Sequence, residues 1–212
     1  MAFQPGLAAG IADEISRRLT RSGIPITVGV SNRHLHLSAA HFESLFGSGA
    51  VMGVLRPLGQ PGQFASSRTV DLEGPKGRVK GVRVLGPARS KTQIEVSLTD
   101  ARTLGIDPPL RQSGSLDAAA GVRLLGPAGS VEAPGSVIIA QRHLHVHTSD
   151  AARLGLKDNE VVRVRVGGPA LRPVVFENVV ARVSDLFALE FHVDTDEANA
   201  AWVKTGDVAY IV

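Results

Sequence analysis

The stretch that decides the fold is Val28-Gly-Val-Ser-Asn-Arg-His-Leu-His-Leu, which recurs 109 residues later as Val137-Ile-Ile-Ala-Gln-Arg-His-Leu-His-Val. In both copies a β-branched strand leads into a His-x-His pair, and a short helix ending at glycine is expected next. Leu85-Gly-Pro-Ala also recurs, at Leu125. Because the offset is about half the chain, we predict duplicated β units forming two similar β barrels or two halves of one.

On both sides of the repeat, 23 glycines and 12 prolines interrupt the sequence and leave little room for long helices. Segments rich in β-branched residues and bounded by turn formers are predicted strands: Ile26–Val30, Val79–Val84, Gln93–Ser97, Gly121–Leu125, Ser136–Ala140, Val161–Val166, Val179–Val183, Leu189–Val193 and Val208–Val212. Short helices are predicted between a capping residue and a glycine stop, with one further helix near the C-terminus: Ser38–Gly47, Thr99–Gly105, Ser149–Gly155 and Asp196–Ala201. The protein should be mainly β.

The N-terminal segment carries apolar residues at a helical spacing. Leu7, Ile11, Ile15 and Leu19 recur every four residues, which predicts an amphipathic helix. The charged residues expected away from this stripe are Asp13, Glu14, Arg17 and Arg18. Such a helix either packs on the body of the protein or binds another protein, and the sequence leaves both open.

Composition excludes several classes of function. The absence of cysteine excludes disulfides, thiolate metal sites and a cysteine nucleophile, so a metal would need His, Asp or Glu ligands. No apolar stretch approaches the roughly 20 residues of a membrane-spanning helix, and no secretory signal is apparent, so we expect a cytoplasmic location. Eighteen of the 23 basic residues are arginine, which favours bidentate binding of phosphate or carboxylate. No phosphate loop, dinucleotide fingerprint or nucleic-acid-binding pattern is present.

The two His-Leu-His units predict metal binding. Residues i and i+2 of a strand share a face, so His34 and His36 can act as one pincer, and His143 and His145 as another. The intervening leucines should point into the core. A single such unit is as well explained by a hydrogen-bonded pair, but two copies on equivalent strands favour metal.

A metal site also needs a third protein ligand. Glu95 is one candidate, although from spacing alone an exposed strand carboxylate explains its position better. His192 is a stronger candidate by residue type, although a hydrogen bond to Asp194 would also explain it. We expect His41 to be a surface residue.

Two arginines are candidates for anion binding. Arg89 lies in Gly86-Pro-Ala-Arg-Ser, and Arg111 precedes Ser113 and Gly114, whose backbone can approach an oxyanion closely. From the residues alone, solvated loops account for such arginine and Ser-Gly pairs better than anion binding does.

Five motifs in order resemble one known family. They are Val28-Gly-Val-Ser-Asn-Arg-His-Leu-His-Leu-Ser, Gly86-Pro-Ala-Arg-Ser-Lys-Thr-Gln-Ile-Glu-Val-Ser, Arg111-Gln-Ser-Gly, Gln141-Arg-His-Leu-His and His192-Val-Asp-Thr-Asp-Glu-Ala-Asn-Ala. The chain from about Pro25 to Val212 resembles the propanediol-utilisation type of phosphotransacylase, also called phosphate propanoyltransferase. The first 24 residues lie outside the resemblance.

The resemblance implies a fold of two β barrels capped by short helices, with the first strand crossing over to the C-terminal barrel. The expected domains are residues 25–32 plus 141–212 for one barrel, and residues 33–140 for the other. Residues 1–24 would form the N-terminal amphipathic helix and linker.

The resemblance also implies a site with two zinc ions. By motif position His34, His36 and Glu95 would bind one ion. The ligands of the other would be His143, His145 and His192. Arg89 would bind phosphate and act in catalysis, with Ser113 and Arg111 as further phosphate ligands. His147 departs from the pattern that family members commonly carry.

The reaction implied is reversible acyl transfer between coenzyme A and inorganic phosphate, on propanoyl-CoA or acetyl-CoA, by direct attack of phosphate on the thioester. The family implies work inside a bacterial microcompartment, with the N-terminal helix binding shell or lumen proteins, and we expect a homodimer. Two other classes compete: a zinc hydrolase or lyase on a β barrel, and a non-catalytic β module with structural histidines. The segment from Arg89 to Glu95 is explained by neither.

Overall fold

The computed structural model describes residues 5–168 and 172–212, and their side chains except those of residues 5–9 and 14. The chain divides into two compact units. Unit 1 comprises residues 1–30, 142–193 and 197–212, and unit 2 comprises residues 31–141 and 194–196. The domain boundaries expected from the sequence stay a prediction.

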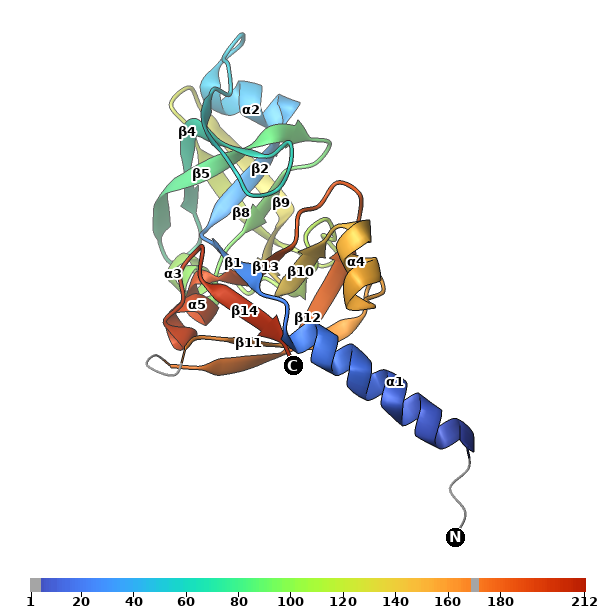
Figure 1. The fold of residues 1–212 in the computed structure, drawn as a ribbon. Helices are drawn as coiled ribbons and strands as arrows, with labels where there is room; N and C mark the ends of the chain where they lie inside the picture. Colours follow the sequence, from blue (N-terminus) through green and yellow to red (C-terminus); the bar gives the residue numbers. More distant parts are fainter. Residues whose placement is uncertain (1–4, 169–171) are drawn as a thin grey trace. The chain divides into compact units, whose positions relative to one another are not determined.

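Unit 1 is built on a closed barrel of six strands in the order β1-β13-β10-β12-β11-β14. Its strands are β1 (Ile26–Ser31), β10 (His143–Val146), β11 (Val161–Val166), β12 (Val174–Val183), β13 (Glu190–Asp194) and β14 (Val208–Ile211). Strand β1, from the beginning of the chain, pairs antiparallel with β14 at its end (Figure 1). The predicted crossover of the first strand into the C-terminal barrel is therefore confirmed.

Unit 2 contains eight strands, six of which close a second barrel. They are β2 (His34–Ser38), β3 (Val54–Pro57), β4 (Phe64–Glu73), β5 (Arg78–Arg89), β6 (Gln93–Glu95), β7 (Leu110–Arg111), β8 (Ala120–Leu125) and β9 (Ser130–Ala140). The ring runs β4-β5-β2-β6-β9-β8 and closes because β8 pairs with both β9 and β4. Strand β3 extends it beside β4, and β7 lies beside β9.

The two barrels share one pattern of strand pairing. Strand β2 runs parallel to β5 and antiparallel to β6, and β10 likewise runs parallel to β12 and antiparallel to β13. The predicted fold class, two similar β barrels with short helices, is confirmed. Because the pairing is duplicated, a residue of one His-x-His strand has a positional equivalent in the other.

The helices are α1 (Pro5–Ser22), α2 (Ala39–Phe46), α3 (Leu98–Leu104), α4 (Thr148–Leu154) and α5 (Thr195–Ala201). Ser38 caps α2 as predicted, accepting a hydrogen bond from the backbone of His41. Two predicted starts were wrong, since Ser97 caps α3 and His147 caps α4. In both cases a residue two positions earlier, at the end of the preceding strand segment, caps the free amides of the first turn.

Several strands exceed or escape the predicted ranges. Strand β4 was missed because serine, arginine and aspartate interrupt its apolar pattern, and β5 and β9 extend well beyond their predicted β-branched centres. The intervening leucines of the two His-x-His units, Leu35 and Leu144, are fully buried in the cores of units 2 and 1 as predicted. Each such leucine contributes about 2 kcal/mol relative to an exposed one.

Helix α1 is anchored to unit 1 at its C-terminal end. The buried Arg21 donates from Nε to Leu154 O at 2.8 Å and from Nη2 to Gly155 O at 2.6 Å, and Nη1 lies 2.9 Å from Glu160 Oε1. These contacts tie α1 to the end of α4 and the turn that follows it.

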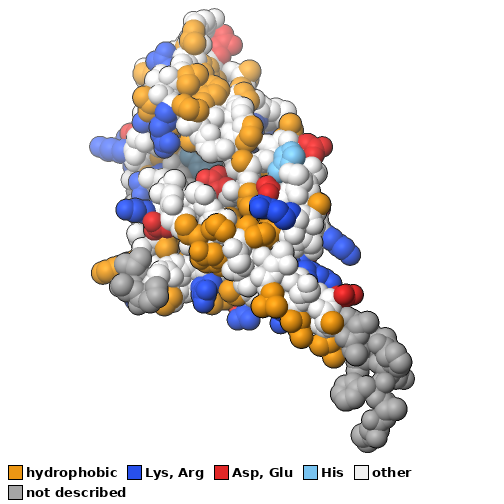
Figure 2. All heavy atoms as spheres, viewed as in Figure 1, with side chains coloured by type: hydrophobic (Ala, Val, Ile, Leu, Met, Phe, Trp, Pro, Cys, Tyr) orange, Lys and Arg blue, Asp and Glu red, His pale blue; other side chains and the backbone are white. Residues whose placement is uncertain are grey.

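The described residues of the apolar stripe on α1 are exposed. The side chains of Ile11, Ile15 and Leu19 are 47, 53 and 68% exposed, and Figure 2 shows hydrophobic side chains along this helix. Leu7 was predicted to lie in the apolar stripe and Glu14 away from it, and the side chains of both are outside the described part of the structure. Across residues 5–168 and 172–212 no helix has both the length and the apolar character needed to cross a membrane.

Candidate functional site

In unit 2 the register between β2 and β6 assembles a block of four polar residues. His34 lies directly opposite Glu95, and His36 lies directly opposite Gln93. Opposite residues of an antiparallel pair share a face, and so do residues two apart on one strand. These four residues are the unit 2 block.

In unit 1 the same register assembles an equivalent block. His143 lies opposite His192 on β13, and the same antiparallel pairing sets His145 opposite Glu190. These four residues are the unit 1 block. The register thus brings together all six predicted metal ligands, three in each barrel.

The three imidazoles of the unit 1 block converge. One candidate ligand atom from each of His143, His145 and His192 lies within 4.8 Å of the others, and no other trio among the described residues meets that spacing. The ring centroids of His143 and His145 are 4.6 Å apart, and those of His143 and His192 are 5.1 Å apart. Such spacing suits three ligands of one ion.

The electrostatics of this trio favour a neutral ring at its central member, His145. Burial lowers the pKa of His145 to about 2, with further lowering by the neighbouring His143, His192 and Arg182. The Nδ1 atom of His145 is buried and makes no hydrogen bond to any described residue. A neutral imidazole with an unused nitrogen is the form that binds a metal.

Glu190 supplies a carboxylate beside the trio. Its Oε2 lies 2.9 Å from His192 Nε2, and a carboxylate in this position orients a metal-binding imidazole. Gly29 on β1 leaves room for it, because a Cβ atom at Gly29 would lie 2.8 Å from Glu190 Oε1. A larger residue at position 29 would therefore displace the side chain of Glu190.

In the unit 2 block His34 and Glu95 face each other. His34 Nε2 lies 3.5 Å from Glu95 Oε2, while His34 Nδ1 lies 2.8 Å from the carbonyl oxygen of Asn32. That carbonyl orients the ring with Nε2 toward the carboxylate. Glu95 is buried, so the alternative of an exposed strand carboxylate is wrong.

His36 completes the candidate ligand set of unit 2. Burial lowers its pKa to about 3, helped by the neighbouring Arg89 and His34 and opposed by Glu95 and a backbone hydrogen bond with Pro87. Its Nδ1 atom is buried and, among the described residues, has no hydrogen-bond partner. The ring centroids of His34 and His36 are 5.9 Å apart, a wider spacing than in unit 1.

Gln93 connects the unit 2 block to the loop that follows β7. Its Nε2 donates to Glu95 Oε1 at 2.7 Å and to Ser113 Oγ at 2.8 Å, and its Oε1 accepts from the backbone of Gly114 at 2.9 Å. The predicted phosphate ligand Ser113 is thereby brought to the block. Sequence reasoning missed Gln93.

The two predicted arginines are placed differently. Arg89 is the last residue of β5, opposite Ser38 in the register with β2, and its charge acts on His36. Arg111 donates from Nε to Asp117 O at 3.0 Å and from Nη1 to Leu110 O at 2.9 Å. Arg111 therefore holds its own loop with two of its donors.

The remaining two histidines have structural contacts. His147 caps α4, where its Nδ1 accepts from the backbone of Ser149 at 3.2 Å, and it occupies the place that Ser38 has before α2. His41 Nδ1 lies 2.9 Å from the hydroxyl of Thr92, which in turn accepts from the backbone of Ser38. Neither contact suggests a metal ligand.

Both blocks fit a bound zinc ion by the chemistry of their donors. Zinc prefers histidine nitrogen and carboxylate oxygen when thiolates are absent, and catalytic zinc keeps three protein ligands and one open position. Each block offers such a trio, with an orphaned buried nitrogen on the central histidine. The same donors also suit cobalt, nickel and copper.

Comparison with known proteins identifies the family. The family described as phosphate propanoyltransferase matches residues 27–204, most of the chain. The chain belongs to the phosphate propanoyltransferase family. A phosphate propanoyltransferase of Thermotoga maritima is 50% identical over 195 residues, covering 92% of each chain.

Two further phosphate propanoyltransferases agree. That of Rhodopseudomonas palustris is 48% identical over 98% of this chain and 91% of its own, and that of Salmonella typhimurium is 49% identical over 90% and 87%. The predicted family and the predicted class, an acyltransferase, are confirmed.

The residues that sequence reasoning missed lie beside the predicted ligands. Gln93 and Glu190 each come two residues before a third ligand, in Gln93-Ile-Glu and Glu190-Phe-His. Phe187 packs on His145 with ring centroids 4.3 Å apart. An alignment of the two third-ligand strands, Gln93-Ile-Glu with Glu190-Phe-His, identifies Gln93 and Glu190 from the sequence.

Proposed function

We propose that this protein transfers a propanoyl or acetyl group reversibly between coenzyme A and inorganic phosphate, with a zinc ion in each barrel. The observation that carries this assignment is the position of Arg89. Arg89 lies opposite Ser38, two residues after His36, and its charge acts on His36, while Ser113 is bonded through Gln93 to Glu95. An anion site thus adjoins a His-His-Glu ligand set, as transfer to phosphate requires.

Arg89 and the residues of the unit 2 block have distinct tasks in the reaction. Arg89 binds phosphate through two donors and aims one oxygen at the thioester carbonyl. Gln93 holds Glu95 and Ser113 in place. A zinc ion held by His34, His36 and Glu95 would polarise the carbonyl and stabilise the departing thiolate. The second set, His143, His145 and His192, would hold the other ion.

The bonds exchanged define the step. An oxygen of phosphate forms a bond to the acyl carbon while the carbon–sulfur bond breaks, and coenzyme A leaves as its thiolate. The products are acyl phosphate and coenzyme A. The chain offers no cysteine to carry the acyl group, so we assign direct attack.

The helix α1 supports a further part of the proposal. Its apolar stripe is exposed while Arg21 anchors its end, so the helix is suited to binding a shell or lumen protein of a bacterial microcompartment. Deleting residues 1–20 should abolish packaging in a host that makes shells, and unchanged packaging would contradict this role. The homodimer and the cytoplasmic location stay predictions.

The test is phosphate-dependent thiol release from acetyl- and propanoyl-CoA, measured on as-purified, chelated and zinc-restored protein with metal content determined on the same samples. We expect release to require phosphate and to follow bound zinc. Zinc-dependent turnover without phosphate would favour a hydrolase or lyase. Bound zinc without turnover would favour a structural module.

Variants of the central histidines refine this test. His36→Ala and His145→Ala should each remove one zinc ion, and His36→Ala should lower thiol release about a thousandfold, since a Lewis acid contributes several kcal/mol. The exposed Arg163, paired with Glu177 on the surface, provides the control Arg163→Gln. A His36→Ala variant with full activity would overturn the assignment.

A further inference from the structure

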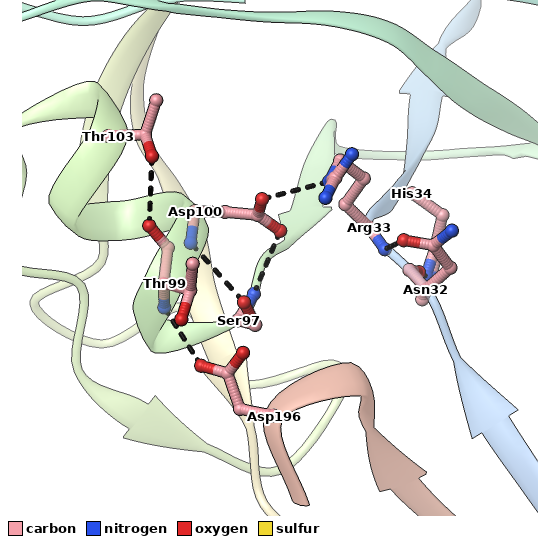
Figure 3. A network of polar contacts seen from close by, with 8 residues as sticks. All are labelled: Asn32, Arg33, His34, Ser97, Thr99, Asp100, Thr103 and Asp196. Atoms are coloured by element: carbon pink, nitrogen blue, oxygen red, sulfur yellow. Dashed lines mark hydrogen bonds and ion pairs between the residues drawn. The ribbon is translucent and has the colours of Figure 1, made fainter. Parts of the chain in front are cut away.

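An ion pair in unit 2 joins the start of the His-x-His strand to the helix after the third ligand. Arg33, immediately before His34, places Nε 2.9 Å from Oδ1 of Asp100 on α3 (Figure 3). Asp100 is five residues after Glu95. Its side chain is only 5% exposed, so the charges interact more strongly than those of a surface pair.

The same carboxylate also holds the end of β6. Asp100 Oδ2 accepts from the backbone of Ser97, two residues after Glu95, while Ser97 Oγ accepts from the backbone of Asp100 in return. At the other end Arg33 donates its backbone N–H to Asn32 Oδ1. Figure 3 shows these contacts as one network that also includes His34.

Unit 1 repeats this ion pair at equivalent positions. Arg142, immediately before His143, places Nε 2.6 Å from Oε1 of Glu197 on α5, and Glu197 is five residues after His192. Arg142 Nη1 also donates to the carbonyl oxygen of Glu177 on β12, at 3.2 Å. The two pairs differ in the acid but agree in both sequence offsets.

The need for such a brace follows from the short strands. Strand β6 has three residues, and only three residue pairs connect it to β2. Strand β6 also pairs with β9 on its other side, but so brief a ladder with β2 makes the position of the third ligand relative to the His-x-His pair depend on further contacts. A displacement of a few tenths of an ångström matters, because zinc ligands must converge on one ion.

We propose that Arg33–Asp100 and Arg142–Glu197 are positioning pairs, each of which sets the metal affinity of its own barrel. Each pair ties the strand of two ligands to the helix that follows the third ligand. This inference rests on the proposed function, because it takes the two blocks as metal sites. The arginines contact no ligand atom of the ion and act through the backbone.

The experiment measures zinc affinity by chelator competition in full-length protein that retains one site. In the His145→Ala background only the unit 2 site remains, and there Arg33→Gln should weaken zinc binding about tenfold to a hundredfold. Arg142→Gln should leave that affinity unchanged. In the His36→Ala background the two arginine variants should exchange roles.

Matched variants separate positioning from general destabilisation. Arg78→Gln in unit 2 and Arg163→Gln in unit 1 break exposed ion pairs and should leave zinc affinity unchanged in both backgrounds. Arg33→Lys should restore part of the affinity lost in Arg33→Gln. If Arg33→Gln does not fold, the same zinc-affinity measurement is made on Arg33→Lys.

The outcomes are distinguishable. If wild-type protein binds no zinc, the metal role in the proposed function is wrong and the positioning pairs are wrong with it. If the parent variants each bind one ion and Arg33→Gln leaves that affinity unchanged, only the positioning role is overturned. Equal weakening of both sites by either arginine variant would also overturn it, because it would indicate a global loss of stability.

Discussion

The unit 1 and unit 2 blocks occupy equivalent places in their barrels, yet each carries its single carboxylate at a different position. In unit 2 the acid is Glu95, opposite His34, and Gln93 fills the neighbouring place. In unit 1 the acid is Glu190, opposite His145, and His192 fills the third-ligand place. The duplicated register thus preserves four positions, two histidines and one carboxyl group, while the residues on β6 and β13 differ between the blocks.

The surroundings of the blocks differ as well. The unit 2 block adjoins polar groups, with Ser113 bonded to Gln93 and Arg89 acting on His36. The unit 1 block adjoins the aromatic ring of Phe187, which packs on His145. This difference supports the proposal that phosphate binds in unit 2. Variants that exchange or remove residues of the two blocks test how far the blocks have diverged.

Among the effects that compare the two blocks, the largest is expected for the arginine whose charge acts on the central histidine of each block. Arg89→Gln should lower kcat/KM for phosphate about a hundredfold, because a charge-assisted bidentate contact contributes roughly 3 kcal/mol. Arg182, whose charge acts on His145 in unit 1, provides the comparison. Arg182→Gln should leave the KM for phosphate unchanged in steady-state assays of thiol release. Equal increases in KM for the two variants would contradict the assignment of phosphate to unit 2.

A smaller effect is expected when the carboxylate is moved between positions. Glu95→Gln should weaken zinc binding in unit 2 about tenfold, since the block loses its only acid. The double variant Gln93→Glu/Glu95→His recreates the unit 1 arrangement and should recover most of that affinity by chelator competition. Failure of the double variant to bind better than Glu95→Gln would show that the blocks are not interchangeable.

The stability of chelated protein should depend on pH through one buried histidine in each block. The pKa values of His36 and His145 are lowered from 6.5 to about 3 and about 2. Below pH 6.5 the unfolded chain therefore binds protons that the folded chain does not, so stability falls as the pH is lowered. Each histidine contributes a slope of about 1.4 kcal/mol per pH unit between pH 6.5 and its lowered pKa.

Urea unfolding of chelated protein at several pH values measures this slope. His36→Gln and His145→Gln should each reduce it by about one proton between pH 4 and pH 6. An unchanged slope in either variant would mean that the corresponding ring is already protonated in the folded chain.

The smallest expected effect concerns the helix caps. Ser38→Ala should destabilise the protein by about 1 kcal/mol, because the first turn of α2 loses its side-chain acceptor. His147→Ser should change stability by less than about 0.5 kcal/mol, because serine caps α4 equally well. Thermal unfolding measures both, and a large loss for His147→Ser would indicate a further role for this histidine.

The sequence predicted much of the site because its signals are local. Residues that are two positions apart on a strand share a face in any fold. Each His-Leu-His pair and its buried leucine therefore followed from strand alternation alone. The caps of α3 and α4 were each misplaced by two residues, since several polar side chains near a helix start can compete for the same amides.

By itself the sequence determined the duplicated strands, the two histidine pairs and, through five motifs, the family. The residues that complete each block followed only from the tertiary structure, since the register of β2 with β6 and of β10 with β13 joins residues 45 to 61 positions apart. Glu95 changed from an ambiguous strand carboxylate to a buried partner of His34, and Gln93 and Glu190 gained a place beside the ligands. The physical reason is that pairing across strands depends on closing long loops, and no local pattern encodes which residues then face each other.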